Sequence, residues 1–255
     1  MNRPIDSIHA GSSSKAGRLF DGLAMGVYPS VARIFGYSFC VGSSEALRHD
    51  AHLVLAGVWG DKGVRPPADL AWVGERYDRA ATWIVAYHGR GQARRPVGVM
   101  GLLDMRVASI GLDCSKRRCP DGMDLERTRE IGRLAILKEH RGGIQTVMVG
   151  LLREMLHWSR QNGIELLFSA SVPRLFEVYR RFNPTAKLLD CEPVADEDPV
   201  MSRYFAPVRE YGGLGVLYTF EVRGASPWSV FSTYLMRIVP RRLKAAIHSA
   251  PPYPR

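Results

Sequence analysis

The sequence predicts an α/β fold in which helices pack on both faces of a mixed, twisted sheet. Three observations support this prediction. Apolar segments of strand length alternate with amphipathic segments of helix length along most of the chain. Two strand-like segments follow each other across a short Gly- and Arg-rich turn, as in a hairpin. A later strand-like segment runs through a basic turn with glycines directly into a long helical segment.

The first predicted strand covers residues 37–44 and has the β-rich composition "YSFCVGSS". Either Ser43 or Ser44 can cap the helix that the next segment, residues 45–59, is expected to form. Residues 81–90 and 96–105 are the two strands of the predicted hairpin. Together these segments predict a helix packed against the start of the sheet.

The second half of the domain is predicted around residues 129–137, the strand "REIGRLAIL". The helix that follows has Met148, Leu151, Leu152 and Met155 at helical spacing and a stop at Gly163. The remaining predicted elements are a buried strand at residues 164–172, a helix at 173–183 that begins at Pro173, and a last strand at 214–222. Residues 114–129 are expected to form a polar connector.

Length and composition limit the expected domain organisation and cellular location. At 255 residues, the chain fits one large domain with appendages, here a variable lead at 1–36, a domain at 37–222 and a basic amphipathic tail at 223–255. No apolar run has the roughly 18 residues that a membrane-spanning helix needs, and the first residues do not resemble a secretory signal, so a cytoplasmic protein is expected. The tail is compatible with a peripheral contact to the inner membrane face or with a solvated helix.

The net charge and the spacing of cysteines and histidines limit which partners and metal ions the protein is expected to bind. The net charge of +10 favours anionic partners, but no nucleic-acid recognition motif accompanies it, so nucleic acid is not an expected partner. Cys114 and Cys119 lack a second pair of ligands at zinc-like spacing, and His49 and His52 lack a third ligand. We therefore expect no metal site.

The turn "KEHRGG" before the long helix has the chemistry of a phosphate site. A helix N-terminus offers unpaired N–H groups and a partial positive charge. Arg141 adds a full charge, and Gly142 and Gly143 allow the backbone close to a ligand. The spacing fits neither a P-loop nor a dinucleotide-binding fingerprint.

The order of strand "IGRLAIL", loop "KEHRGG", amphipathic helix, strand "IELLFSA" and helix "YRRFN" resembles the core of the GNAT superfamily of N-acyltransferases. Four segments resemble one branch of it, the acyl-homoserine-lactone synthases and long-chain N-acyl amino acid synthases. They are "ALRHDAHLVLAGVWG", "ERYDRAATWIVAYHG", "VGVMGLLDM" and "REIGRLAIL".

This resemblance implies a bacterial enzyme that moves a long-chain acyl group from acyl carrier protein, or from acyl-CoA, to the amine of an amino acid. It implies co-substrates and no permanently bound cofactor. Leu134, Ile136, Arg141, Gly142 and Gly143 would then bind the phosphopantetheine arm of the donor. The loop is one residue shorter than the usual superfamily pattern, which favours the single phosphate of a carrier arm. Acyl carrier protein is acidic and would suit the basic chain.

The same resemblance suggests roles on the acceptor side. Glu130 is the candidate for amine binding or proton acceptance, and Arg133 for binding the acceptor carboxylate or fixing Glu130. The alternative for both is a cross-strand salt bridge. Residues three apart in a regular strand face opposite sides, so the two can share a site only if the strand is bulged, for which Gly132 is the natural place.

Other assignments keep two interpretations. Arg48 and Asp78 either shape the acceptor side or are a solvated helix charge and a loop aspartate. Several aromatic residues either line an acyl tunnel or form ordinary core: Trp158, Phe168, Phe176, Tyr179 and Phe182. An acyl-homoserine-lactone synthase and a non-catalytic module that binds acyl carrier protein or lipid are the alternative functions.

Overall fold

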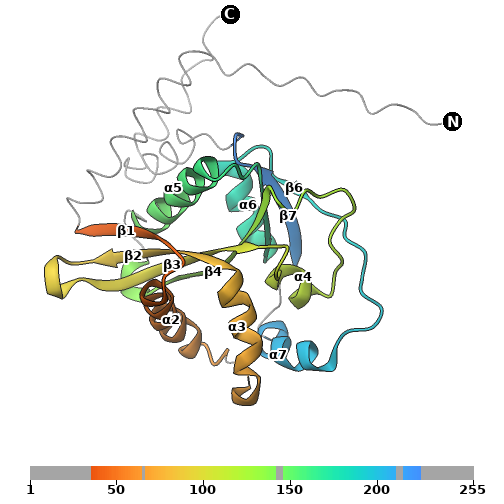
Figure 1. Ribbon diagram of the computed structural model, residues 1–255, viewed down its shortest axis with the longest axis horizontal. Coiled ribbons are helices and arrows are strands. Elements are labelled where there is room, and N and C mark those ends of the chain that lie inside the picture. The colour runs from red at the N-terminus through yellow and green to blue at the C-terminus, as the bar shows by residue number, and fades with distance from the viewer. Residues whose placement is uncertain (1–35, 65–66, 142–145, 211–214, 225–255) are drawn as a thin grey trace, which may run out of the picture.

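The computed structural model describes residues 36–64, 67–141, 146–210 and 215–224. They form one seven-stranded sheet in the order β1-β2-β3-β4-β5-β7-β6 (Figure 1). Only β4 and β5 are parallel neighbours, and all other neighbours in the sheet are antiparallel. The strands are β1 Tyr37–Gly42, β2 Ala81–His88, β3 Arg95–Asp104, β4 Thr128–Ile136, β5 Leu166–Ser171, β6 Lys187–Leu188 and β7 Val216–Glu221.

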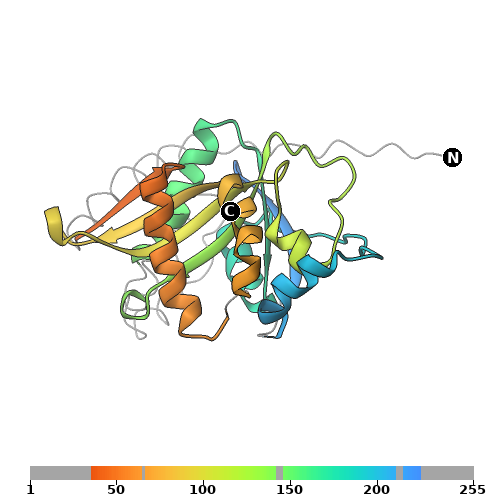
Figure 2. The same cartoon turned by 60° about the horizontal axis from the view of Figure 1, so that its bottom comes forward.

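Helices cover both faces of this sheet (Figures 1 and 2). One face carries α2 Glu45–Gly60, α3 Ala71–Ala80, α4 Ile110–Ser115 and α7 Pro199–Glu210. The opposite face carries α5 Thr146–Gln161 and α6 Pro173–Phe182. Short 3₁₀ turns lie at Ala68–Leu70, Gly91–Ala93 and Lys138–His140. None of the helices in the described ranges is both long and apolar enough to cross a lipid bilayer.

Local sequence signals explain where the predicted elements begin and end. The Ser44 hydroxyl accepts a hydrogen bond from the Leu47 amide at 3.3 Å, so Ser44 rather than Ser43 caps α2. Helix α5 is followed by Gly163 at a φ of 68°, in the left-handed region that glycine tolerates. Helix α6 begins at Pro173, which lacks the N–H that a first helical residue leaves unpaired. The predicted strands and these helices are confirmed.

Three of the helices, α3, α4 and α7, were not predicted from the sequence. Helix α4 overlaps the start of the segment expected to be a polar connector, and α7 includes an internal proline, Pro207. Helix α3 is short and buries only four of its residues, among them Val73 and Tyr77. Such short helices depend for their stability on packing against the rest of the fold.

Apolar cores lie on both faces. Helices α5 and α6 contribute to the core of one face, and α2, α3 and α7 to that of the other. Strands β4 and β5 pair only as far as Ile131 and Ser169, although β4 continues to Ile136. The two strands therefore diverge beyond Ile131, and there the main-chain groups of β4 that point away from β3 are left without a strand partner.

Of the three predicted segments, the described residues cover most of the central domain. The lead at 1–36, apart from Gly36, and the tail beyond Gly224 lie outside them. The proposed division of the chain stays a prediction.

Candidate functional site

Strand β4 carries a bulge where the sequence required one. Val99 pairs with Ala135 and Gly101 with Gly132, so Met100 of β3 faces two residues of β4. Arg133, one of these two, has a φ of 52°, in the left-handed region that few non-glycine residues adopt. The bulge directly follows Gly132 and turns the strand so that Glu130 and Arg133 line one cavity.

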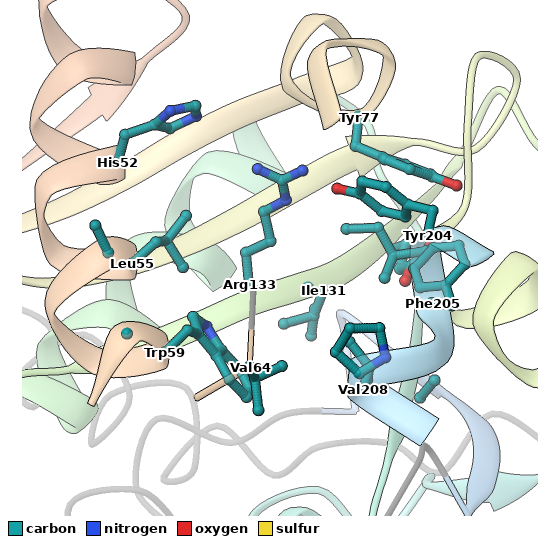
Figure 3. Close-up of a pocket in the computed structure, with 17 residues that line it drawn as sticks. His52, Leu55, Trp59, Val64, Tyr77, Ile131, Arg133, Tyr204, Phe205 and Val208 are labelled. Carbon is teal, nitrogen blue, oxygen red and sulfur yellow. The ribbon is translucent and has the colours of Figure 1, made fainter. Parts of the chain in front are cut away.

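This cavity has a volume of about 640 Å³ and lies over β4, between α2 and α7 (Figure 3). Its walls are largely apolar and aromatic, with a small number of charged side chains. The lining residues are His52, Leu55, Ala56, Trp59, Gly60, Val64, Tyr77, Ile110, Glu130, Ile131, Gly132, Arg133, Ala170, Tyr204, Phe205, Pro207 and Val208. An apolar cavity with a few converging polar groups is typical of a small-molecule site.

Glu130 is the most deeply buried charged group of the cavity, with 1% of the residue exposed. Its Oε1 atom accepts a hydrogen bond from the Gly111 amide at 2.7 Å, while Oε2 has no partner among the described residues. Burial raises the pKa of Glu130 to about 7, and hydrogen bonds from Ser109 and the α4 amides limit the rise. A carboxylate with this pKa and one free oxygen can accept a proton near neutral pH.

Gly111 allows α4 to approach Glu130 closely. A Cβ atom at this position would lie 2.7 Å from the Cβ of Ala170, closer than side chains pack. Ser109 caps α4 by accepting from the Leu112 amide at 3.2 Å, which turns the helix N-terminus toward the carboxylate. The sequence signal for this support is the capping serine in "ASIGLDC", which the prediction of a polar connector missed.

Asp78 joins Arg133 to a histidine that had no predicted role in acyl transfer. Arg133 forms an ion pair with Asp78 Oδ1 and donates to the Gly74 carbonyl at 3.3 Å. His52 Nε2 lies 3.0 Å from the other oxygen, Asp78 Oδ2. Figure 3 shows His52 reaching from α2 and Tyr204 from α7 on either side of Arg133. This ion pair is not the cross-strand salt bridge that the sequence offered as the alternative, because Asp78 lies on helix α3, and Glu130 is not the partner of Arg133.

The donor-side prediction concerns the end of β4 and the turn after it. Leu137 donates its amide to the Val97 carbonyl of β3 at 2.9 Å. Because main-chain groups alternate along a strand, those of Ile136 and Leu134 point away from β3, toward the gap that opens beside β5. The Arg141 guanidinium bonds to the Ile136 carbonyl, so it lies at the same end of the gap.

Gly142 and Gly143, the glycines of the predicted phosphate turn, lie outside the described residues. The role of the whole donor set stays a prediction.

Two groups of predicted residues are not brought to the cavity. Arg48 lies outside the lining set and is 3.7 Å from Glu45 on the same helix. Of the aromatic residues considered for an acyl tunnel, Phe168, Phe176 and Tyr179 are buried in the cores, and Trp158 packs against one core. The side chain of Phe182 lies outside the described part of the chain. Aromatic lining comes instead from elements that include the unpredicted α7.

In the part of the chain that the structure describes, no group of three or more His, Cys, Asp or Glu side chains could hold a metal ion.

No family model matches the chain, and neither does any curated protein. Solved structures do match. The AHL synthase LasI aligns with a TM-score of 0.50 and 14% identity over 77% of this chain and 95% of its own. FeeM, an N-acyl amino acid synthase from uncultured soil microbes, aligns with a TM-score of 0.48 and 10% identity over 73% of this chain and 90% of its own. YhbS, a GNAT family N-acetyltransferase from Escherichia coli solved with CoA, aligns with a TM-score of 0.44 and 12% identity over 74% of this chain and 82% of its own.

The alignment with LasI and the mixed seven-stranded sheet with helices on both faces confirm the predicted GNAT-like α/β fold. The resemblance to the acyl-homoserine-lactone synthase branch, inferred from the sequence, is thereby confirmed at the level of fold.

Proposed function

We propose that the protein is an N-acyltransferase that moves a long-chain acyl group from acyl carrier protein to the amine of an amino acid. The observation that carries this proposal is Glu130, a fully buried carboxyl group with one free oxygen in the wall of a largely apolar cavity. Structural ion pairs bury carboxylates with both oxygens satisfied. A buried carboxyl group that has an unpaired oxygen and belongs to the wall of a cavity is the arrangement expected of a proton acceptor.

The reaction is direct aminolysis of a thioester. The acceptor amine attacks the thioester carbonyl, the C–S bond breaks, and the amine nitrogen loses a proton as the amide forms. Glu130 takes that proton and returns it to the departing thiolate, which leaves as a thiol. Holding the amine and the thioester together in the cavity supplies much of the rate, since it makes an intermolecular step effectively intramolecular.

Arg133 is proposed to bind the carboxylate of the acceptor. Its guanidinium is anchored by Asp78 and the Gly74 carbonyl, and it still lines the cavity. The guanidinium has five N–H donors, so these anchors leave donors for a second carboxylate. The bulge at Arg133 sets this group on the same side of the sheet as Glu130, which fits an acceptor that carries both an amine and a carboxylate.

The donor is proposed to enter through the gap between β4 and β5. An extended pantetheine arm can hydrogen-bond to the main chain of Leu134 and Ile136, and Arg141 would meet its phosphate. The net charge of +10 suits an acidic carrier protein as the donor. Such a donor implies a cytoplasmic reaction, and the tail at 223–255 is proposed to contact the inner membrane face.

Mass spectrometry of lipid extracts from a bacterial host that expresses the chain tests this proposal. New N-acyl amino acids should accumulate, and their masses would identify the acceptor and the chain length. Glu130→Gln keeps the shape of the side chain and removes its basicity, so the products should disappear. Glu165→Gln is the matched control, because Glu165 is an exposed carboxylate that is paired with Arg127 and lies outside the cavity lining.

Absence of N-acyl amino acids from a host that contains the soluble wild-type protein would contradict the proposal. Products that persist with Glu130→Gln would contradict the role of Glu130. If the wild-type chain binds acyl carrier protein but forms no product, the protein is the non-catalytic binding module instead.

An acyl-homoserine-lactone synthase is the second candidate, favoured by the fold shared with LasI. Such an enzyme uses S-adenosylmethionine as its amine and releases methylthioadenosine. Purified protein supplied with acyl carrier donor and either S-adenosylmethionine or a mixture of amino acids separates the two. Methylthioadenosine release would replace the leading proposal, and N-acyl amino acid formation would exclude the second.

A further inference from the structure

We propose that His52, oriented by Asp78, is a second proton acceptor at the solvent end of the cavity, where it deprotonates the ammonium group of the incoming acceptor. This inference rests on the proposed function and adds a catalytic residue to it. His52 lines the cavity, and 47% of its side chain is exposed, so it lies where the cavity meets water.

The geometry fixes which nitrogen of His52 can act as the base. Nε2 lies 3.0 Å from Asp78 Oδ2, and the other oxygen of Asp78 is occupied by Arg133. An ionised carboxylate cannot donate a hydrogen bond, so Nε2 carries the hydrogen and Nδ1 keeps its lone pair. The ring also packs edge-on against Trp83, with centroids 5.9 Å apart and planes at 81°. A histidine oriented by a carboxylate in this way is a common form of general base.

Two bases suit the chemistry because the acceptor must lose two protons. The α-amino group of an amino acid is mostly protonated at neutral pH and is no nucleophile in that form. Glu130 can hold only one proton at a time, and it is fully buried. His52 removes the ammonium proton and releases it to water. Glu130 takes the second proton, from the attacking nitrogen, and passes it to the carrier sulfur.

The charged and titratable groups around His52 are consistent with His52 taking the first proton and Glu130 the second. Asp78 and Tyr77 come from α3, Glu130 and Arg133 from β4, and Tyr204 from α7. Asp78 stabilises the imidazolium that forms, while Arg133 opposes it through the same carboxylate. Burial raises the pKa values of Tyr77 and Tyr204, so both hydroxyls stay neutral in the working range and do not compete as bases.

The test is the pH dependence of purified His52→Gln with acyl carrier donor and amino acid acceptor. At pH 7 the rate should fall about 10- to 100-fold, as expected for loss of a general base. The defect should shrink as the pH rises toward 10, because the amine then arrives already deprotonated. The KM for the acyl donor should not change. His49→Gln is the matched control, since His49 is an exposed histidine on the same helix and lies outside the cavity lining.

Chemical rescue distinguishes a base from a structural partner of Asp78. Imidazole added to His52→Ala should restore activity, and substituted imidazoles of higher pKa should restore more. A wild-type-like rate for His52→Gln at every pH would overturn the inference. So would a defect that is constant with pH and not rescued, because that result marks a purely structural role. Failure of the proposed function appears differently, as absence of product from the wild-type protein.

Discussion

Helices α5 and α6 cover their face of the sheet with close-packed apolar side chains, whereas α2, α3 and α7 leave a cavity over theirs. On the α5 face, Leu151, Leu167 and Tyr218 are fully buried. On the α2 face, the buried groups include the charged residues Glu130 and Asp78. Native interiors are close-packed and rarely bury unsatisfied charge, so the second face departs from that rule at the position where chemistry is proposed.

The comparison suggests a division of labour between the faces. The filled face stabilises the sheet through hydrophobic burial, and the other face gives up some of that burial to keep a cavity open. Burial of Glu130 and the left-handed backbone at Arg133 both oppose folding. Variants on the two faces should therefore fail in different ways.

The largest effect is expected for Glu130→Gln on catalysis. The amide cannot accept the proton, so kcat should fall about 10²- to 10⁴-fold. In the wild-type protein the rate should rise with pH until about pH 7, since Glu130 acts only when ionised and its pKa is about 7. Product formation by purified protein across pH 5 to 9 measures both. A fall of less than threefold, with the pH profile kept, would show that the cavity works without this base.

The next prediction concerns Leu151→Ala on the filled face. Leu151 is fully buried in the core beneath α5, so the free energy of unfolding should fall by about 2–5 kcal/mol. Below the melting temperature, KM and the pH profile should stay unchanged. Denaturant unfolding and steady-state kinetics measure the two effects.

Leu55→Ala is the matched variant on the other face, because Leu55 lines the cavity and is only partly buried. It should destabilise less than Leu151→Ala and should change the KM for a substrate. Equal losses of stability from the two variants would remove the distinction between the faces.

The third prediction is that Glu130→Gln stabilises the fold above neutral pH. The pKa of Glu130 is about 7 in the folded protein and 4.5 without the fold, so the native state binds the extra proton between these values. Wild-type stability attributable to this group therefore falls as the pH rises from about 4.5 to 7 and stays low above that. At about 1.4 kcal/mol per pKa unit, the variant should gain up to about 3 kcal/mol at pH 8. Denaturant midpoints at pH 5 and pH 8 measure this, and an equal difference at both would refute it.

The predictions from sequence succeeded where a local signal exists. The Ser44 cap, the Pro173 start and the alternation of strand and helix each depend on neighbouring residues, and all are realised. The bulge could be anticipated because Glu130 and Arg133 needed it to share a site. In a regular strand, residues three apart face opposite sides of the sheet, so a shared site required a bulge between them.

What the sequence did not reveal depends on contacts between distant segments. The pairing of Asp78 with His52 joins α3 to α2, and the bond from Gly111 to Glu130 joins α4 to β4. Neither leaves a pattern at a fixed spacing. Helix α7 was not predicted either, and the burial of Tyr204 and Phe205 depends on such a distant contact, since both rings pack against Tyr77 of α3.

The smallest effect is expected for Arg203→Ala on α7, which closes one side of the cavity. Arg203 pairs with Asp69 at 2.8 Å, but the two side chains are 61% and 58% exposed. Solvent screens such a pair, so its removal should change the free energy of unfolding by less than about 1 kcal/mol and leave KM unchanged. Denaturant unfolding at low and high salt measures this contribution.

Arg209→Ala on the same helix is the informative contrast. Arg209 bonds to Glu197 and to the Cys114 carbonyl, and only 23% of its side chain is exposed. Burial opposes ionisation of Glu197, but hydrogen bonds from Arg209, Lys116 and Ser202 lower its pKa to about 2. Arg209→Ala should therefore destabilise the fold more than Arg203→Ala and raise the KM for a substrate, because α7 loses its tie to α4. Equal losses of stability from Arg203→Ala and Arg209→Ala would mean that surface charge holds α7 in place. High salt should then also open the cavity in the wild-type protein.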